Sequence, residues 1–264
     1  MQSNGNQAAE FIKVLHPTLA AANLSDVGIN CCDATGWNVA SQHASQLKSS
    51  GVESMLYAVT SHEYSSRVGS PMNIKTRVWQ SEYCDLGGGW TTPWYSNGGA
   101  GDGYTWANTV YNGIVNGNLS AYIWWEAVQD RATNNNNNEK LILVEGQNYT
   151  VSKRLWAFAQ WRVVRPGAVR VSASGGSNLK FAAFVNADGS IAVVAINTGT
   201  SAQTLSVLVN GAGFAAGSVA GKAWSTDASK DMVAQEATVG SDGTVTANVG
   251  ARGVVSFLIN GTPS

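Results

Sequence analysis

The sequence contains little charge, few prolines and no long apolar run. Only 12% of its 264 residues are charged and the formal net charge is −1, which excludes a strongly basic surface of the kind that binds nucleic acid. No segment approaches the ~20 consecutive apolar residues that a membrane-spanning helix needs. The first residues are polar and lack the apolar core of a signal peptide. We therefore expect neither a nucleic-acid partner nor a membrane partner.

Cysteine and histidine are also scarce. Cys31, Cys32 and Cys84 are too few, and odd in number, for a disulfide framework. All three lie in apolar strand-like contexts, so we predict buried thiols. Of the 3 histidines, only His62 falls in a plausible cleft. The sequence therefore predicts no metal site, and it contains no motif that indicates a cofactor.

Glycine, tryptophan and uncharged polar residues are abundant instead. There are 29 glycines and 10 tryptophans, together with many Asn, Ser, Thr and Gln residues. Such a neutral, amide- and hydroxyl-rich surface suits a neutral polyhydroxyl ligand such as a sugar, although the tryptophans can equally be core residues. Glycan acceptor sequons, which matter if the chain passes through a secretory pathway, start at Asn23, Asn118, Asn148 and Asn260.

The first two-thirds of the chain alternates helical and strand-like segments. Near-continuous apolar strands separated by helices predict a parallel sheet covered by helices, and four strands are half of a closed eight-stranded barrel. A long connection at 87–104, rich in glycine and aromatic residues, predicts a functional or disordered loop, and 134–138 predicts a mobile loop tip. We expect helices at 7–22, 39–49, 106–115 and 151–161, and strands at 27–32, 54–59, 76–82 and 121–125.

The texture changes after Pro166. Short alternating runs follow, separated by turn sequences such as Asn186-Ala187-Asp188-Gly189 and Asp242-Gly243, which predict β-hairpins. About a hundred residues of this pattern make a β-sandwich. We therefore predict two domains, a barrel-like region at 1–166 and a β-sandwich at 167–264.

Glu82 is the leading candidate for a catalytic residue. It ends the strand Thr76–Glu82, and parallel barrels keep their chemistry at the carboxyl ends of strands. Tyr83 is a candidate to hold this carboxylate by a phenolic hydrogen bond. Hydrolysis of a glycosidic bond normally requires a second carboxylate. The candidates, each of which can equally bind substrate or cap a helix, are Asp33, Glu63, Asp85 and Glu126.

Aromatic and histidine side chains surround this candidate site in the predicted sheet. Trp124 and Trp125 are adjacent on a strand, so alternation sends one of them into the barrel mouth, where an indole is a suitable platform for a sugar ring. His62 and Tyr64 are candidates to order the site by hydrogen bonding. A single histidine at a strand end is, alternatively, an ordinary polar residue.

These motifs together resemble glycoside hydrolase family 30. The resemblance rests on Trp79–Tyr83, Trp124–Glu126 and Ser152–Phe158 leading to Arg165–Gly167 and a sandwich, and Cys31–Trp37 and Ser61–Tyr64 are most similar to fungal xylan-active members. It implies a (β/α)8 barrel fused to a β-sandwich, with a retaining mechanism and Glu82 as nucleophile at the seventh strand. The implied substrate-binding residues are Trp37, His62, Tyr64, Trp124, Trp125 and Glu126.

The sequence departs from the family pattern in two ways. The family's acid/base lies in an Asn-Glu-Pro motif after the fourth strand, and this sequence contains no Asn-Glu-Pro. The first predicted strand matches the fifth strand of the family's barrel. We therefore expect the chain to supply strands five to eight of the barrel and to be inactive alone. Arginines that follow the eighth strand in glucuronoxylanases are replaced by Ala127–Gln129, which argues against recognition of glucuronate by that route.

The resulting hypothesis is a secreted retaining glycosidase acting on a plant cell-wall polysaccharide or its oligosaccharides. An endo-β-1,4-xylanase or glucuronoxylanase fits best, and the resemblance leaves β-1,6-galactanase and glucosylceramidase open. The alternative hypothesis, from a different class, is a non-catalytic carbohydrate-binding remnant. Open barrel edges in such a remnant favour self-association.

Overall fold

The computed structural model describes residues 3–132, 137–211, 215 and 217–261. It divides into two compact units, of which the first is Met1–Cys84 with Thr109–Ala127 and the second is Asp85–Asn108 with Val128–Ser264. This division differs from the predicted domain boundary after Pro166, which stays a prediction. None of the described helices is both long and apolar enough to cross a membrane.

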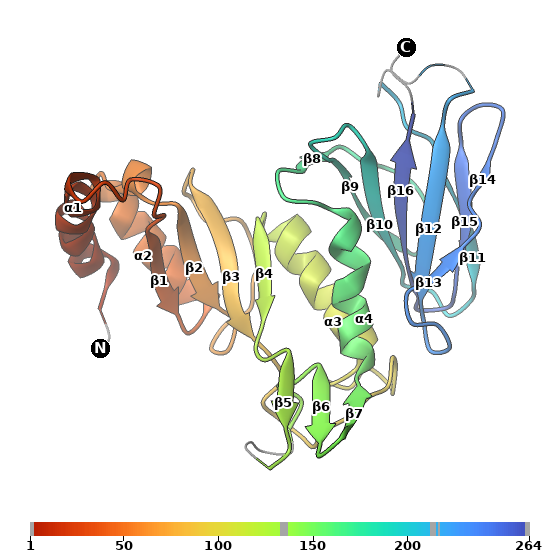
Figure 1. Cartoon of the computed structure of the whole chain (residues 1–264), viewed down its shortest axis with the longest axis horizontal. Coiled ribbons are helices and arrows are strands. Elements are labelled where there is room, and N and C mark those ends of the chain that lie inside the picture. Colours follow the sequence, from red (N-terminus) through yellow and green to blue (C-terminus); the bar gives the residue numbers. More distant parts are fainter. Residues whose placement is uncertain (1–2, 133–136, 212–214, 216, 262–264) are drawn as a thin grey trace. The chain divides into compact units, whose positions relative to one another are not determined.

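The first unit is built on a four-stranded parallel sheet (Figure 1). Its strands are adjacent in the order in which they occur in the chain, and every pair is parallel. The carboxyl ends of the strands therefore share one edge of the sheet, which is what the apolar strand pattern predicts. The strands are β1 (Asn30–Ala34), β2 (Ala58–His62), β3 (Arg77–Tyr83) and β4 (Ala121–Trp124).

Two helices pack against this sheet, α1 (Gly5–Ala21) and α2 (Trp37–Ser49). The side chain of Asn4 accepts the backbone N–H of Gln7, and the Gln7 side chain accepts the N–H of Asn4, so a capping box starts α1. The core between helices and sheet combines residues from both. It includes Ala9, Ile12, Ala44, Leu47, Val59 and Val78.

The second expected strand position is partly wrong. We expected a strand at 54–59, but Glu53–Met55 forms a 3₁₀ helix and β2 starts only at Ala58. The Glu53 carboxylate accepts the backbone N–H of Lys75, so this acidic side chain holds a turn rather than a strand. The next helix, α3 (Gly103–Tyr111), continues into a π-helical turn at Asn112–Asn116 before β4.

The second unit contains a small sheet that was not predicted from the sequence. Its strands are β5 (Val128–Asp130), β6 (Ile142–Glu145) and β7 (Asn148–Val151), with β6 and β7 forming an antiparallel hairpin. Gly146 in the turn has φ 61°, a conformation that favours glycine. The helix that follows, α4 (Lys153–Ala159), ends in a 3₁₀ turn at Gln160–Val163.

The long connection at 87–104 is held by a buried arginine. Arg154 is fully buried and donates to the carbonyl oxygens of Thr91, Gly101 and Lys140 at 3.0, 2.6 and 3.1 Å. Asp102, 1% exposed, accepts the backbone N–H of Ser96 at 2.6 Å. The loop is thus ordered by buried charged groups.

The predicted loop tip at 134–138 is only partly described, because 134–136 lie outside the described residues. Asn138 is 3% exposed, accepts the backbone N–H of Thr91 at 2.8 Å and donates to Asp85 at 3.0 Å. Asn137 is buried as well. These two residues are therefore structural, which corrects the expectation of a mobile tip at their positions.

The rest of the second unit confirms the predicted β-sandwich. A six-stranded sheet faces a three-stranded one, and residues from both form a common core that includes Val193, Val249 and Phe257. The expected hairpins at Gly189 and Gly243 join β9 to β10 and β14 to β15. The larger sheet contains β8 (Val169–Val171), β9 (Leu179–Val185), β10 (Ile191–Asn197), β12 (Ala220–Thr226), β13 (Val233–Gln235) and β16 (Val254–Asn260), and the smaller contains β11 (Gln203–Val207), β14 (Thr238–Val239) and β15 (Val245–Val249).

Candidate active site

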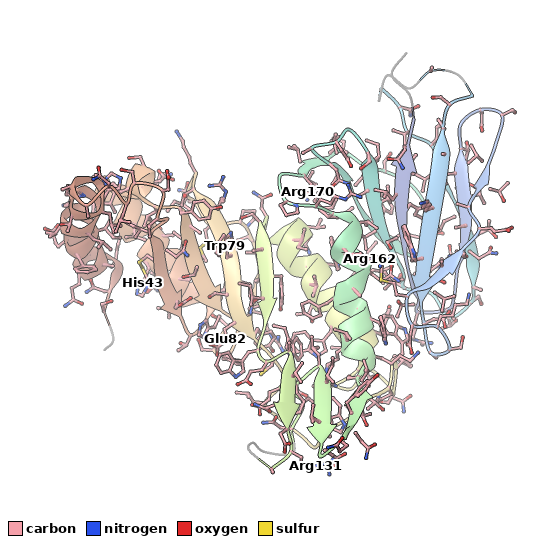
Figure 2. The ribbon with its side chains drawn as sticks, viewed as in Figure 1. His43, Trp79, Glu82, Arg131, Arg162 and Arg170 are labelled. Atoms are coloured by element: carbon pink, nitrogen blue, oxygen red, sulfur yellow. A yellow bond between two sulfur atoms is a disulfide. The ribbon has the colours of Figure 1, made fainter. Side chains whose placement is uncertain are left out.

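Glu82 and His62 lie side by side at the carboxyl edge of the parallel sheet. Glu82 is near the end of β3 (Figure 2), its side chain is 27% exposed, and it is in register with His62 at the end of β2. Nδ1 of His62 is 3.8 Å from Oε1 of Glu82. This separation is an ion-pair distance rather than a hydrogen bond. The structure thus brings together two residues that the sequence analysis predicted separately as candidates for the site.

Asp33 contacts the other nitrogen of the same imidazole. Its Oδ1 lies 3.9 Å from Nε2 of His62 and accepts the hydroxyl of Ser81 at 2.5 Å. The backbone N–H of Asp33 donates to Oγ1 of Thr60 at 3.2 Å. His62 therefore connects two carboxylates, one from β1 and one from β3.

Tyr64 supplies the phenol that interacts with Glu82. Burial is the largest cause of the raised pKa of Tyr64. The contact with Cys84 and the interaction with Glu82 raise this pKa further. The hydroxyl is therefore protonated at physiological pH and can donate to the carboxylate. The sequence reading gave this role to Tyr83, but Tyr83 is 6% exposed and its ring packs against Tyr64 at 5.3 Å and under Arg67 at 4.3 Å.

Glu63 and Asp85, both candidates for the second carboxylate, are engaged elsewhere. Glu63 is 3% exposed and accepts the backbone N–H of Val68 at 3.2 Å. Burial raises the pKa of this carboxyl, and the hydrogen bond from the backbone N–H of Val68 partly opposes that rise. Asp85 belongs to the second unit, where it accepts from Gly87 at 3.0 Å and from Asn138. Glu63 is therefore buried in the first unit, and Asp85 holds a loop of the second unit.

The predicted sugar-binding tryptophans have different environments. Trp37 is 3% exposed, belongs to the core under the sheet, and donates its indole N–H to the carbonyl of Ser70 at 2.9 Å, so its surroundings argue against a substrate contact. Trp125 is 43% exposed directly after β4. Trp124, in register with Tyr83, and Glu126 are half-buried. Trp125 is therefore the accessible indole nearest in sequence to the carboxyl edge.

Two of the cysteines form a disulfide, which corrects the expectation of buried thiols. Cys31 and Cys32, adjacent residues of β1, are bonded to each other, whereas Cys84 is a buried, reduced thiol with its Sγ 3.5 Å from the hydroxyl of Tyr64. The disulfide borders a hollow of about 470 Å³ on the first unit. The hollow is lined by Ser3, Asn30, Cys31, Cys32, Asp33, Thr60, Trp79, Ser81 and Ile123.

Comparison with known proteins assigns a family to this arrangement. Residues 167–257 match the model of the glycosyl hydrolase family 30 β-sandwich domain. The catalytic domain of the family 30 xylanase C from Talaromyces cellulolyticus is 41% identical, with a TM-score of 0.88 over 98% of this chain. The chain is a relative of glycoside hydrolase family 30.

More distant family 30 structures share the fold. A subfamily 8 xylanase from Clostridium acetobutylicum is 19% identical with a TM-score of 0.72, covering 98% of this chain and 61% of its own. An endoxylanase from Clostridium papyrosolvens is 18% identical with a TM-score of 0.70, covering 99% and 62%. This family 30 relative spans 58% of the length of the Talaromyces xylanase domain that it matches.

Proposed function

We propose that the chain is part of a retaining glycoside hydrolase that cleaves xylan, with Glu82 as the nucleophile. One observation carries the proposal: the carboxylate of Glu82 stands at the carboxyl edge of a parallel sheet, beside His62 and Tyr64, in a chain 41% identical to a family 30 xylanase over 98% of its length. Strand ends of this kind hold the chemistry of parallel barrels. The four parallel strands support assignment to half of such a barrel.

The chemistry divides between Glu82 and a second carboxylate. An oxygen of Glu82 forms a bond to the anomeric carbon while the bond from that carbon to the leaving oxygen breaks, and the sugar becomes an ester of the enzyme. The leaving oxygen needs a proton from an acid, which later deprotonates the attacking water. We assign to Tyr64, whose hydroxyl interacts with Glu82, the role of orienting the carboxylate.

We place the acid/base on a segment outside the present sequence. A retaining pair of carboxyl groups is separated by ~5–5.5 Å. Glu63 is buried and Asp33 is engaged by Ser81 and His62, and the Asn-Glu-Pro motif that the family resemblance implies for the acid/base does not occur in the sequence. The chain alone should therefore form the glycosyl ester only with an activated leaving group, and unactivated xylan should lose the ~10²–10⁴-fold contribution of general acid catalysis.

The disulfide supports a secreted protein. Disulfides persist in oxidising compartments and are rare in the cytosol, and the chain carries one between Cys31 and Cys32. The sequons at Asn23 and Asn148 are exposed in the structure, as acceptors of glycans need to be.

Labelling with an activated fluoro-xylobioside tests the assignment of Glu82. The dinitrophenolate of a dinitrophenyl 2-deoxy-2-fluoro-xylobioside leaves without acid assistance as the sugar is transferred, so the chain should gain the mass of one fluoroxylobiosyl group, and peptide mapping should place it on Glu82. Glu82→Gln should not be labelled, whereas the matched variant Glu63→Gln should be labelled normally. Xylobiose binding without an adduct would favour a non-catalytic binding remnant, and concentration-dependent dimerisation would support pairing through the edges at β1 and β4.

A further inference from the structure

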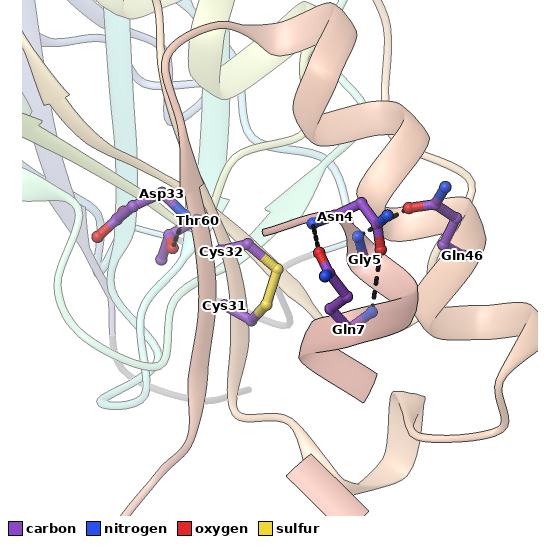
Figure 3. The surroundings of a disulfide bond; sticks show 8 residues. All are labelled: Asn4, Gly5, Gln7, Cys31, Cys32, Asp33, Gln46 and Thr60. Carbon is purple, nitrogen blue, oxygen red and sulfur yellow. Dashed lines mark hydrogen bonds between the residues drawn. A yellow bond between two sulfur atoms is a disulfide. The ribbon is translucent and has the colours of Figure 1, made fainter. Parts of the chain in front are cut away.

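The disulfide between Cys31 and Cys32 lies directly before Asp33 in β1 (Figure 3). A bond between neighbouring residues closes a small ring that includes the backbone joining them. The backbone entering Asp33 is consequently restricted by a covalent link as well as by strand pairing. Cys31 is also packed in the core under the sheet, which holds the ring against the core on that side.

Asp33 is held in one conformation although its side chain is 63% exposed. Its φ is 51°, in the left-handed region that few non-glycine residues adopt. The N–H of Asp33 donates to Thr60 and its carboxylate accepts from Ser81. An exposed carboxylate normally samples several rotamers, so these restraints determine where its charge lies.

That charge faces His62, and His62 faces Glu82. The two ion-pair distances are 3.9 Å at Nε2 and 3.8 Å at Nδ1. A continuous series of contacts therefore leads from the disulfide through Asp33 and the imidazole to the proposed nucleophile. All of these residues belong to the first unit.

We propose that the Cys31–Cys32 disulfide is a redox-sensitive positioning element for Glu82, acting through Asp33 and His62. Asp33 and His62 are positioning residues in this scheme, and the significance for catalysis rests on the proposed role of Glu82. Reduction breaks the sulfur–sulfur bond, each sulfur takes up a proton, and a small dithiol supplies the two electrons as it closes to its own disulfide. The open thiols release the backbone before Asp33, and its carboxylate loses its fixed place beside His62.

The disulfide is open to such a reagent. Both cysteines border the hollow of about 470 Å³, together with Asp33 and Ser81. Cys84 is not part of a disulfide, so a reductant has one disulfide to act on among the described residues. The response of the protein to a dithiol therefore reports on this bond.

The ring resonances of the three histidines provide the test. The whole chain is compared by ¹⁵N-detected imidazole NMR with and without a small dithiol, and His62→Gln assigns the His62 signals. We expect reduction to shift the ring signals of His62 and to leave those of His16 and His43 unchanged. The double variant C31S/C32S should show the reduced-type His62 signals and no response to the dithiol.

Coupling through Asp33 is tested by combining reduction with a substitution. Asp33→Asn should shift the His62 signals and abolish their response to the dithiol, and Ser81→Ala should weaken that response, because contacts in series are not additive. Unchanged His62 signals on reduction, or a full response in Asp33→Asn, would overturn the proposal. Shifts of all three histidines would overturn it too, because the disulfide would then stabilise the unit as a whole. Failure of Glu82 labelling alone leaves the NMR result intact and rejects only the proposed function.

Discussion

Tyr64 and Glu82 interact at the carboxyl edge of the sheet: burial is the main reason that the pKa of the Tyr64 hydroxyl is raised, and the contacts with Cys84 and Glu82 raise it further. Glu82 belongs to β3, and Tyr64 lies in the segment that follows the neighbouring parallel strand β2. The Tyr64 ring is in turn packed between His62 at 5.8 Å and Tyr83 at 5.3 Å. The phenol that interacts with Glu82 is therefore itself fixed by ring packing.

Replacing Tyr64 with Phe should slow labelling of Glu82 by the fluoro-xylobioside about 10- to 100-fold. Hydrogen bonds to charged groups contribute roughly 1.5–3 kcal/mol, and the substitution removes the donor while keeping the ring. Intact-mass kinetics measure the rate. Tyr57→Phe is the matched control, because Tyr57 is 43% exposed and stacks edge-on against Trp79; equal rates in both variants would contradict the role of Tyr64.

Glu63 should make the free energy of unfolding fall as pH rises. Burial raises the pKa of its carboxyl above the ordinary value of 4.5, so in the window above 4.5 the folded state holds a proton that the unfolded state has lost. Stability is then lost as pH rises through the raised pKa. Urea unfolding from pH 4 to pH 8 should show a flatter pH profile for Glu63→Gln. Glu10→Gln, an exposed helix residue, should keep the parent profile, and a parent-like slope in Glu63→Gln would refute this assignment.

Arg154→Met should destabilise the second unit by more than about 3 kcal/mol. The substitution keeps an unbranched chain but leaves the carbonyl groups of Thr91, Gly101 and Lys140 without the charged donor, and buried acceptors without partners are costly. Arg165→Met removes an exposed ion pair with Asp188 and should cost less than about 1 kcal/mol. Urea denaturation of the two variants checks the difference, and similar losses would show that burial of Arg154 is not the cause.

Expression through a eukaryotic secretory pathway should place glycans on Asn23 and Asn148. Both asparagines are exposed, and Ser25 and Thr150 at the third sequon positions are exposed too. Peptide mass spectrometry before and after enzymatic deglycosylation measures occupancy. The variants Asn23→Gln and Asn148→Gln should each lose one glycan, and unmodified peptides in the secreted parent protein would contradict the expectation.

Local patterns predicted much of this fold because they act over short distances. The apolar run that ends at Glu82 and the turns at Gly189 and Gly243 are specified by neighbouring residues, and β3 and both hairpins are observed. The hairpin of β6 and β7 has a comparable glycine turn at Gly146, but it was not predicted from the sequence. These elements follow from strand alternation and glycine turns.

The arrangement of the site depended on features that no local pattern reveals. The pairing of β2 with β3 is irregular between Ser61 and His62, and a shift in pairing changes which side chains share a face. His62 and Tyr64 consequently reach Glu82, while Glu63 is buried. The bond between Cys31 and Cys32 and the seating of Asp33 likewise depend on tertiary geometry.

The division of the chain between the two units has a consequence for its synthesis. Because Asp85–Asn108 belongs to the second unit and Thr109–Ala127 to the first, neither unit is a continuous stretch of sequence. A ribosome must release the polypeptide through Ala127 before the first unit has all its strands. The residues of Asp85–Asn108 are made before the rest of the second unit, with which they pack. Truncation after Cys84 would remove β4 along with everything downstream, so neither unit can be produced by itself as an uninterrupted piece of this chain.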